Sequence, residues 1–191
     1  MINLAVFASG SGTNAENLVH YFNEHPEIRI SLILCNRPDA FVLQRAKQLN
    51  IPAHTFNKND FYHNENVLKA LVDYKIDCLV LAGFLWLIPD NLLKAFPQRI
   101  INIHPALLPR YGGKGMYGRY VHEAVVANGE KETGITIHLV DAEYDNGEIL
   151  FQAKCPVLPD DTPEMVAAKV HELEHRYFPI VVEQWAVTRN L

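Results

Sequence analysis

Cysteine is scarce in this sequence, and the few cysteines it has do not form a recognisable motif. The three cysteines, Cys35, Cys78 and Cys155, lie far apart, and none forms a Cys-x-x-Cys pair. This spacing argues against a disulfide framework and against a cysteine zinc site. Because Cys35 and Cys78 sit within apolar runs, we expect them to be buried thiols that pack as small hydrophobic side chains.

Long hydrophobic runs and an excess of basic residues are also missing. A membrane helix needs about 20 consecutive apolar residues, whereas the segment from Leu79 to Ile88 is interrupted by Gly83 and followed by Pro89. The N-terminal residues lack the basic segment of a secretory signal. The 17 Lys and Arg are outnumbered by 22 Asp and Glu, so the formal net charge is -5. The protein therefore has no overall positive electrostatic field that would attract nucleic acid. We expect a cytoplasmic protein without membrane or nucleic-acid partners.

What the sequence does contain is a regular alternation of apolar, strand-length runs with amphipathic segments. This order predicts an α/β fold: a Rossmann-like, mostly parallel central sheet with flanking helices and an antiparallel C-terminal pair. No linker rich in Gly, Ser or Pro divides the chain, which predicts a single domain over residues 1–191. The expected strands are Asn3 to Ala8, Ile28 to Cys35, Ala53 to Phe56, Cys78 to Ala82, Ile100 to Ile103, Gly134 to Val140 and Glu148 to Lys154. The expected helices are Asn14 to Asn23, Ala40 to Leu49, Asn64 to Tyr74, Asn91 to Phe96, Tyr120 to Ala127 and about Pro163 to Val187, the last kinked or interrupted at Pro179.

The most informative motif is Asn102-Ile103-His104-Pro105-Ala106-Leu107-Leu108-Pro109, at the end of an apolar run. In a strand, residues two apart point to the same face, so Asn102 and His104 would converge on one site. An imidazole can move a proton near pH 7, an amide can hold a developing oxyanion, and the carboxylate of Asp145 could orient the imidazole and raise its pKa. The set fits acyl transfer without a covalent intermediate, because no Gly-x-Ser-x-Gly elbow occurs. The alternative is a plain strand end and a polar Asp145-Asn146-Gly147 turn.

A second motif, Ser9-Gly10-Ser11-Gly12-Thr13-Asn14, lies between the first expected strand and the first expected helix. Glycines allow a tight turn there, and the amides at a helix N-terminus attract an anion such as a phosphate. The spacing is neither that of a dinucleotide-binding loop nor that of a Walker A loop. A simple strand-to-helix turn capped by Thr13 or Asn14 is the alternative.

Histidines form a third pattern. His171, Glu172 and His175 match the H-E-x-x-H string of zinc helices, but no third ligand is evident, so a substrate-facing helix without metal is preferred. His138 lies in an apolar alternating run, where a hydrogen-bonded core or pocket-wall role is expected. His122 has no evident partner in the sequence, and packing is its default interpretation.

Taken together with Ala82-Gly83-Phe84-Leu85, these motifs resemble the folate-dependent phosphoribosylglycinamide formyltransferases of purine biosynthesis, from Met1 to about the final helix. The resemblance implies transfer of the formyl group of 10-formyltetrahydrofolate to the amine of phosphoribosylglycinamide, giving formylglycinamide ribonucleotide and tetrahydrofolate. It implies two small-molecule substrates, no metal, and a monomer or homodimer.

The resemblance also assigns roles to residues. In it, Asn102 and protonated His104 would stabilise the oxyanion, and Asp145 would keep His104 charged. The implied catalytic residues are Asn102, His104 and Asp145; the substrate phosphate would bind Gly12, Thr13 and Asn14; the substrate amine would bind Glu174 and His171; and the folate would bind Phe84, Leu85, Trp86, Leu87, Asn102, Asp141 and Asp145.

The sequence departs from the family pattern in two places. Tyr62-His63-Asn64-Glu65 stand where the family commonly has an arginine that contacts the folate tail, and the flap at residues 112–118 is unusually rich in glycine. Formyltetrahydrofolate deformylases share the catalytic string but usually carry an extra domain ahead of it, and methionyl-tRNA formyltransferases resemble a longer chain with an RNA-binding module. A non-catalytic folate- or phosphate-binding module is the alternative from another class.

Overall fold

The computed structural model describes residues 1–188, and a seven-stranded sheet in the order β3-β2-β1-β4-β5-β6-β7 forms its centre. Every neighbouring pair from β3 to β5 is parallel, whereas the β5-β6 and β6-β7 pairs are antiparallel. The predicted fold class is confirmed, and the last three residues of the predicted 1–191 domain lie outside the described residues. The strands are β1 Ile2–Ala8, β2 Ile28–Cys35, β3 Ala53–Thr55, β4 Cys78–Leu81, β5 Ile100–His104, β6 Glu132–Leu139 and β7 Ile149–Pro156.

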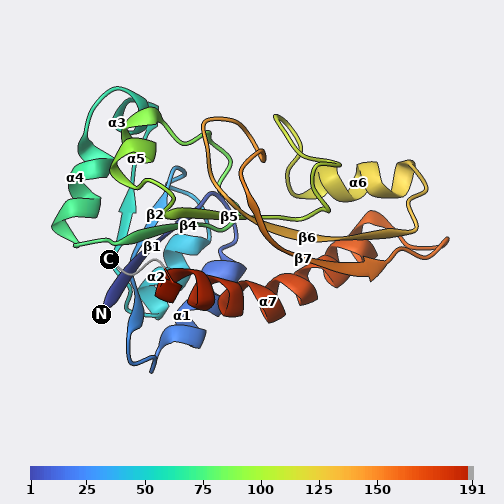
Figure 1. The fold of residues 1–191 in the computed structure, drawn as a ribbon, viewed down its shortest axis with the longest axis horizontal. Coiled ribbons are helices and arrows are strands. Elements are labelled where there is room, and N and C mark those ends of the chain that lie inside the picture. Colours follow the sequence, from blue (N-terminus) through green and yellow to red (C-terminus); the bar gives the residue numbers. More distant parts are fainter. Residues whose placement is uncertain (189–191) are drawn as a thin grey trace.

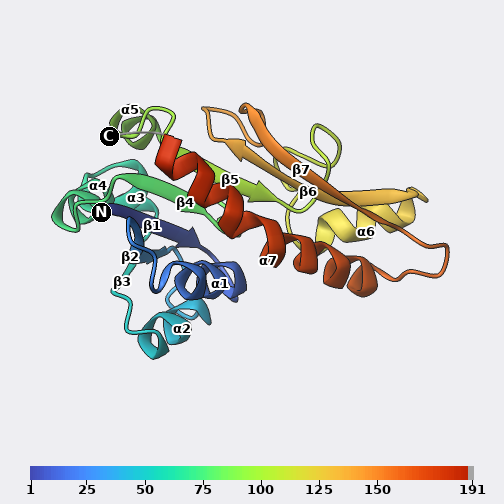
Figure 2. The same cartoon turned by 60° about the horizontal axis from the view of Figure 1, so that its bottom comes forward.

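Helices cover both faces of the sheet (Figures 1 and 2). Because strand side chains alternate between faces, Leu4 and Val6 of β1 join one apolar core while Ala5 and Phe7 join the other. The first core is closed by α1, α2, α6 and α7, and the second by α3, α4 and α5. The helices are α1 Thr13–Phe22, α2 Val42–Gln48, α3 Lys58–Tyr62, α4 Asn66–Asp73, α5 Asp90–Ala95, α6 Arg119–Ala127 and α7 Pro163–Thr188.

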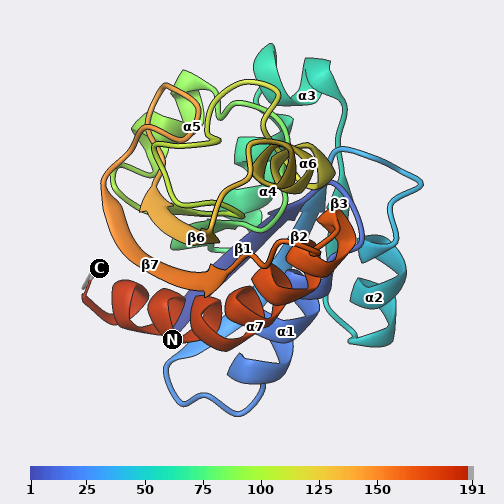
Figure 3. The ribbon, with the colours of Figure 1, turned by 90° about the vertical axis from the view of Figure 1, so that its right-hand side faces the viewer.

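The long helix α7 corrects the expectation of an interruption, since it continues through Pro179. Proline has no N–H, so Pro179 cannot donate to the carbonyl of His175 one turn earlier. The Asn17 side chain of α1 donates to that carbonyl instead, with a distance of 2.9 Å from Nδ2 to the oxygen. Helices α1 and α7 lie side by side on one side of the sheet (Figure 3), and this contact satisfies the group that the proline leaves free.

Two smaller differences concern local signals. The predicted helix from Asn64 begins instead at Asn66, and the short helix α3 precedes it. Helix α3 starts with a capping box, in which Asn57 accepts from the Asp60 amide and Asp60 accepts from the Asn57 amide. Cys35 and Cys78 are buried, as expected. Within residues 1–188, no helix is long and apolar enough to cross a membrane.

The topology determines where a ligand site can form. The loops after β1, β4 and β5 all leave from the carboxyl ends of parallel strands, which meet at one edge of the sheet. The N-terminal half of α7 and the start of α6 lie on the same side (Figure 1). Residues far apart in sequence therefore surround one space.

Candidate active site

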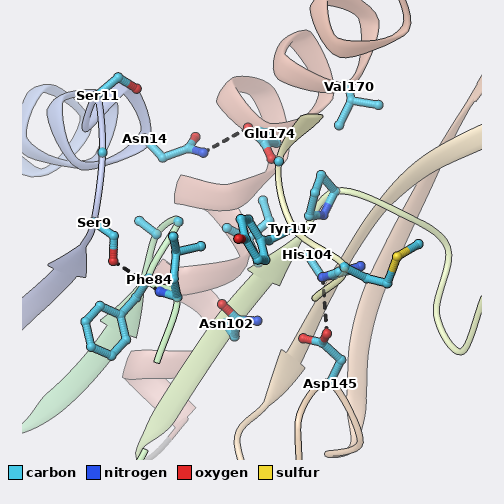
Figure 4. Close-up of a pocket in the computed structure, with 18 of the residues that line it drawn as sticks. Ser9, Ser11, Asn14, Phe84, Asn102, His104, Tyr117, Asp145, Val170 and Glu174 are labelled. Carbon is cyan, nitrogen blue, oxygen red and sulfur yellow. Dashed lines mark hydrogen bonds and ion pairs between the residues drawn. The ribbon is translucent and has the colours of Figure 1, made fainter. Parts of the chain in front are cut away.

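A cavity of about 600 Å³ lies at the carboxyl ends of the parallel strands. Its walls come from the loops after β1, β4 and β5, from the flap at 112–118, from Tyr144 and Asp145, and from α6 and α7 (Figure 4). The sequence motifs described above thus meet in one site.

Asn102, His104 and Asp145 line this cavity together. Asn102 and His104 are alternate residues of β5, and Asp145 approaches from the loop before β7 with a positive φ of 54°. Aspartate tolerates that left-handed conformation better than most residues, and such conformations gather at functional sites. His104 Nδ1 lies 3.5 Å from Asp145 Oδ2, and both side chains are largely buried (Figure 4).

Both ring nitrogens of His104 face an acceptor. Nε2 donates to the Tyr111 carbonyl at 2.7 Å, because a carbonyl can only accept, so the neutral ring carries its proton on Nε2. A second proton would lie on Nδ1, opposite Asp145. Burial lowers the pKa of His104 more than Asp145 and the Tyr111 carbonyl raise it. Asp145 thus acts on the pKa in the expected direction, but burial outweighs it and holds the resting imidazole toward its neutral form.

His138 orients the amide of Asn102. Its Nδ1 donates to the Leu139 carbonyl at 2.7 Å, which leaves Nε2 as an acceptor for Asn102 Nδ2 at 3.0 Å. Because an amide nitrogen has two hydrogens, Asn102 keeps one to donate into the cavity. Burial raises the pKa of Asp145, but His138, 3.6 Å away, His104 and the Gly113 amide outweigh burial and lower it overall. His138 is buried, as the sequence indicated.

In the described part of the chain, the Ser9 to Asn14 loop, expected to bind a phosphate, leaves the N-terminus of α1 without a side-chain cap. Gly12 occupies the N-cap position with φ 76°, and no side chain in the described structure caps the helix. A Cβ at Gly12 would lie 2.4 Å from Val42 Cγ2, so the turn requires glycine. Thr13 and Asn14 line the cavity, but neither acts as the cap that the alternative interpretation required.

Asn14 instead connects this loop to α7. Its Nδ2 donates to Glu174 Oε2 at 2.9 Å (Figure 4). His171 Nδ1 donates to the same oxygen at 2.8 Å. The hydrogen bond to Glu174 raises the pKa of His171. The Nδ1 of His171 is therefore engaged with the Glu174 carboxylate. Residues 1–188 contain no group of three or more His, Cys, Asp or Glu that could hold a metal ion.

The predicted folate residues divide into two groups. Phe84 and Leu85 line the cavity beside Asn102 and Asp145, and Leu85 donates its amide to Ser9 Oγ. The other three, Trp86, Leu87 and Asp141, lie outside the cavity lining. Trp86 packs against Tyr62, whose hydroxyl donates to the Leu87 carbonyl, and Asp141 accepts hydrogen bonds within its own loop.

The flap at 112–118 lines the cavity through Lys114 and Tyr117, among others. Sequence reasoning did not assign Arg37 and His122 to the site, although both line the cavity. His122 did carry a signal, since it shares the buried face of α6 with Val121 and Val125. An imidazole on an otherwise apolar helix face indicates either a core hydrogen bond or a site.

The comparisons with known proteins agree with this geometry. A model of the formyl transferase family matches residues 2–182. The chain belongs to the formyl transferase family. This formyl transferase is 41% identical to the chloroplastic phosphoribosylglycinamide formyltransferase of Arabidopsis thaliana, over 94% of this chain and 63% of that protein. It is 35% identical to the phosphoribosylglycinamide formyltransferase of Haemophilus influenzae, over 96% of this chain and 86% of that protein.

A solved structure agrees as well. Glycinamide ribonucleotide transformylase 1 from Geobacillus kaustophilus superimposes on this formyl transferase with a TM-score of 0.87 at 36% identity, covering 96% of this chain and 98% of that one. The chain spans less than two thirds of the length of the plant relatives, 63% and 59%, but most of the length of the bacterial ones.

Proposed function

We propose that this formyl transferase moves the formyl group of 10-formyltetrahydrofolate to the amine of phosphoribosylglycinamide, in purine biosynthesis. The observation that carries the proposal is the Asn14–Glu174 hydrogen bond, which joins an uncapped helix N-terminus to a buried carboxylate inside the cavity of Asn102, His104 and Asp145. A helix N-terminus suits a phosphate, and a carboxylate suits an amine. The relatives bearing this activity in their names support the choice of substrate.

In this proposal, different parts of the cavity bind different groups of the two substrates. The amides of Gly12, Thr13 and Asn14 hold the phosphate, and Glu174 with His171 holds the amine. Phe84 and Leu85 form an apolar wall for the pterin ring. Trp86, Leu87 and Asp141 lie outside the cavity lining, so they contact the part of the folate that extends beyond the cavity. No metal takes part.

The chemistry depends on charge that develops during the reaction. As the amine attacks the formyl carbon, the carbonyl oxygen becomes negative, and the free N–H of Asn102 stabilises it. Negative charge nearby favours a proton on His104 Nδ1, where Asp145 faces it. His104 is therefore neutral at rest. The proton that the amine loses reaches His104 as the oxyanion forms, and it moves on to the folate nitrogen as the bond between that nitrogen and the formyl carbon breaks.

One assay tests the proposal. Purified protein is mixed with 10-formyltetrahydrofolate, with and without phosphoribosylglycinamide, and both products are followed. We expect formylated product only when the amine substrate is present, and a kcat about 10²–10³-fold lower for Asn102→Ala. Folate hydrolysis without the amine substrate would instead indicate a deformylase, and binding without turnover a silent module; either result contradicts the proposal.

The cellular setting and the oligomeric state of the enzyme are part of the proposal. We propose that it acts in the cytoplasm as a monomer or homodimer, without nucleic-acid or membrane partners. Size-exclusion chromatography with light scattering measures the oligomeric state.

A further inference from the structure

His122 is a buried histidine in the cavity wall that no role above uses. Its residue is 7% exposed, and its Nδ1 has no hydrogen-bond partner within residues 1–188. Buried polar atoms are nearly always paired, so an unpaired one in a ligand cavity indicates a partner that arrives with the ligand. The donors that the proposed substrates bring include the N–H groups of the reacting amine and the hydroxyls of the sugar.

The charged and titratable groups that face His122 come from two elements packed against α6. Glu174 and His171 of α7 and His104 of β5 all act on the imidazole electrostatically. Burial lowers the pKa of His122, His171 and His104 lower it further, and Glu174 raises it. On its own helix, Arg119 is engaged with Glu123 and lies near Glu164. A buried imidazole with a lowered pKa thus lines the same cavity as His104 and as Glu174, the carboxylate proposed for the amine.

The reaction proposed above requires a proton acceptor. When the amine forms a bond to the formyl carbon, its nitrogen must lose a proton, and the departing folate nitrogen must gain one. Asp145 is a poor acceptor because its pKa is lowered, and Glu174 Oε2 already receives hydrogen bonds from Asn14 and His171. His104 donates through Nε2 to the Tyr111 carbonyl and faces Asp145 through Nδ1.

We propose that His122 accepts the proton that the attacking amine releases. This inference rests on the proposed function. The amine nitrogen forms its bond to the formyl carbon, the carbonyl electron pair moves to the oxygen and returns, and the bond from that carbon to the folate nitrogen breaks. The proton taken by His122 passes through His104 or water to the departing nitrogen. Each turnover therefore leaves both histidines as they began and needs no other reactant.

The test compares His122→Asn and His122→Gln with His175→Asn, a matched control on an exposed turn of α7 outside the cavity lining. We expect kcat to fall about a hundredfold or more in both His122 variants, with KM for each substrate changed less than about threefold. The acidic limb of the kcat profile against pH disappears in these variants, and added imidazole restores part of the rate. His175→Asn keeps the wild-type kcat and profile.

Several results would overturn the inference. A kcat within threefold of wild type, an unchanged acidic limb, or a rise in KM alone would assign His122 to packing or binding. Titration of the 15N-labelled imidazoles of the unmutated protein by NMR provides a readout that does not depend on variants folding: His122 is expected to be neutral at pH 7, and a protonated ring there contradicts the proposal. If the unmutated enzyme makes no formylated product, the proposed function itself fails, which is a different outcome.

Discussion

At the scale of single residues, Gly12 shapes the backbone of the proposed phosphate site. Its φ of 76° is unfavourable for other residues, and a Cβ would meet Val42 Cγ2 at 2.4 Å. We expect Gly12→Ala to cost about 1–3 kcal/mol of unfolding free energy and to raise KM for the phosphorylated substrate at least about tenfold, because the loop amides shift. Urea unfolding and steady-state kinetics measure the two effects.

The neighbouring glycine is the control for this prediction. A Cβ at Gly10 would meet nothing within 4 Å, although Gly10 also lines the cavity. Gly10→Ala should therefore keep its stability to within about 1 kcal/mol. Equal loss of stability in both variants would show that general loop stiffening, and not the contact with Val42, controls the turn.

His138 allows a second test at this scale, as a positioning residue. It accepts a hydrogen bond from Asn102 Nδ2, so His138→Leu removes the acceptor that fixes the amide. We expect kcat to fall about 10- to 100-fold with little change in KM, since the lost interaction acts in the transition state. In the double variant with Asn102→Ala, the loss should equal that of Asn102→Ala alone. Additive losses would mean that His138 acts independently of Asn102.

The proposed catalytic residues show how much of the site the sequence could predict. The two-residue period of a strand was enough to place Asn102 and His104 in the same cavity. The contact between His104 and the Tyr111 carbonyl was not predictable, because it depends on an irregular loop. The net direction of the His104 pKa shift was not predictable either, since the strength of desolvation depends on packing from elements distant in sequence.

At the scale of elements, the continuity of α7 depends on a side chain of α1. Asn17 donates to the His175 carbonyl that Pro179 cannot reach. Asn17→Ala should therefore lower the unfolding free energy by about 1–2 kcal/mol, the typical cost of leaving such a carbonyl unpaired. Urea unfolding followed by circular dichroism measures the change.

A double-mutant cycle with Pro179→Ala isolates this interaction. An alanine at 179 restores a backbone N–H that can donate to the His175 carbonyl, so the effect of Asn17→Ala should shrink to a few tenths of a kcal/mol in that background. An equal effect in both backgrounds would show that Asn17 stabilises the protein by another route.

The helices and strands show which structural features a sequence pattern can predict and which it cannot. Buried parallel strands such as β1 and β4 appear as continuous apolar runs, so they were found directly. Helix α3 has five residues and too little periodicity to detect, although its capping box at Asn57 was visible as a spacing. The unbroken α7 could not be inferred, because its missing hydrogen bond is replaced from a helix about 160 residues earlier.

At the scale of the whole molecule, the cavity gathers titratable groups from β5, α6 and α7 and buries them unevenly. Burial favours the neutral forms of His104 and His122, whereas the hydrogen bond to Glu174 favours the charged form of His171. Because these elements are far apart in sequence, the groups meet only in the folded chain. Folding and protonation are therefore linked.

The direction of this linkage can be predicted. The pKa of a histidine in the unfolded chain is 6.5, and the pKa values of His104 and His122 are lower than this in the folded protein. As the pH falls below 6.5, the unfolded chain therefore binds protons at these histidines before the folded protein does. The unfolding free energy should fall from about pH 6.5 to pH 5. The contribution of His171 is already complete below 6.5 and is lost only as the pH rises through its raised folded pKa. Asp145, with its lowered pKa, loses its contribution only in more acidic solution. Urea unfolding at several pH values measures this effect. The unfolding free energy should depend less on pH in the double variant His104→Gln with His122→Gln, with His175→Gln as the control. A wild-type protein as stable at pH 5 as at pH 6.5 would contradict this account.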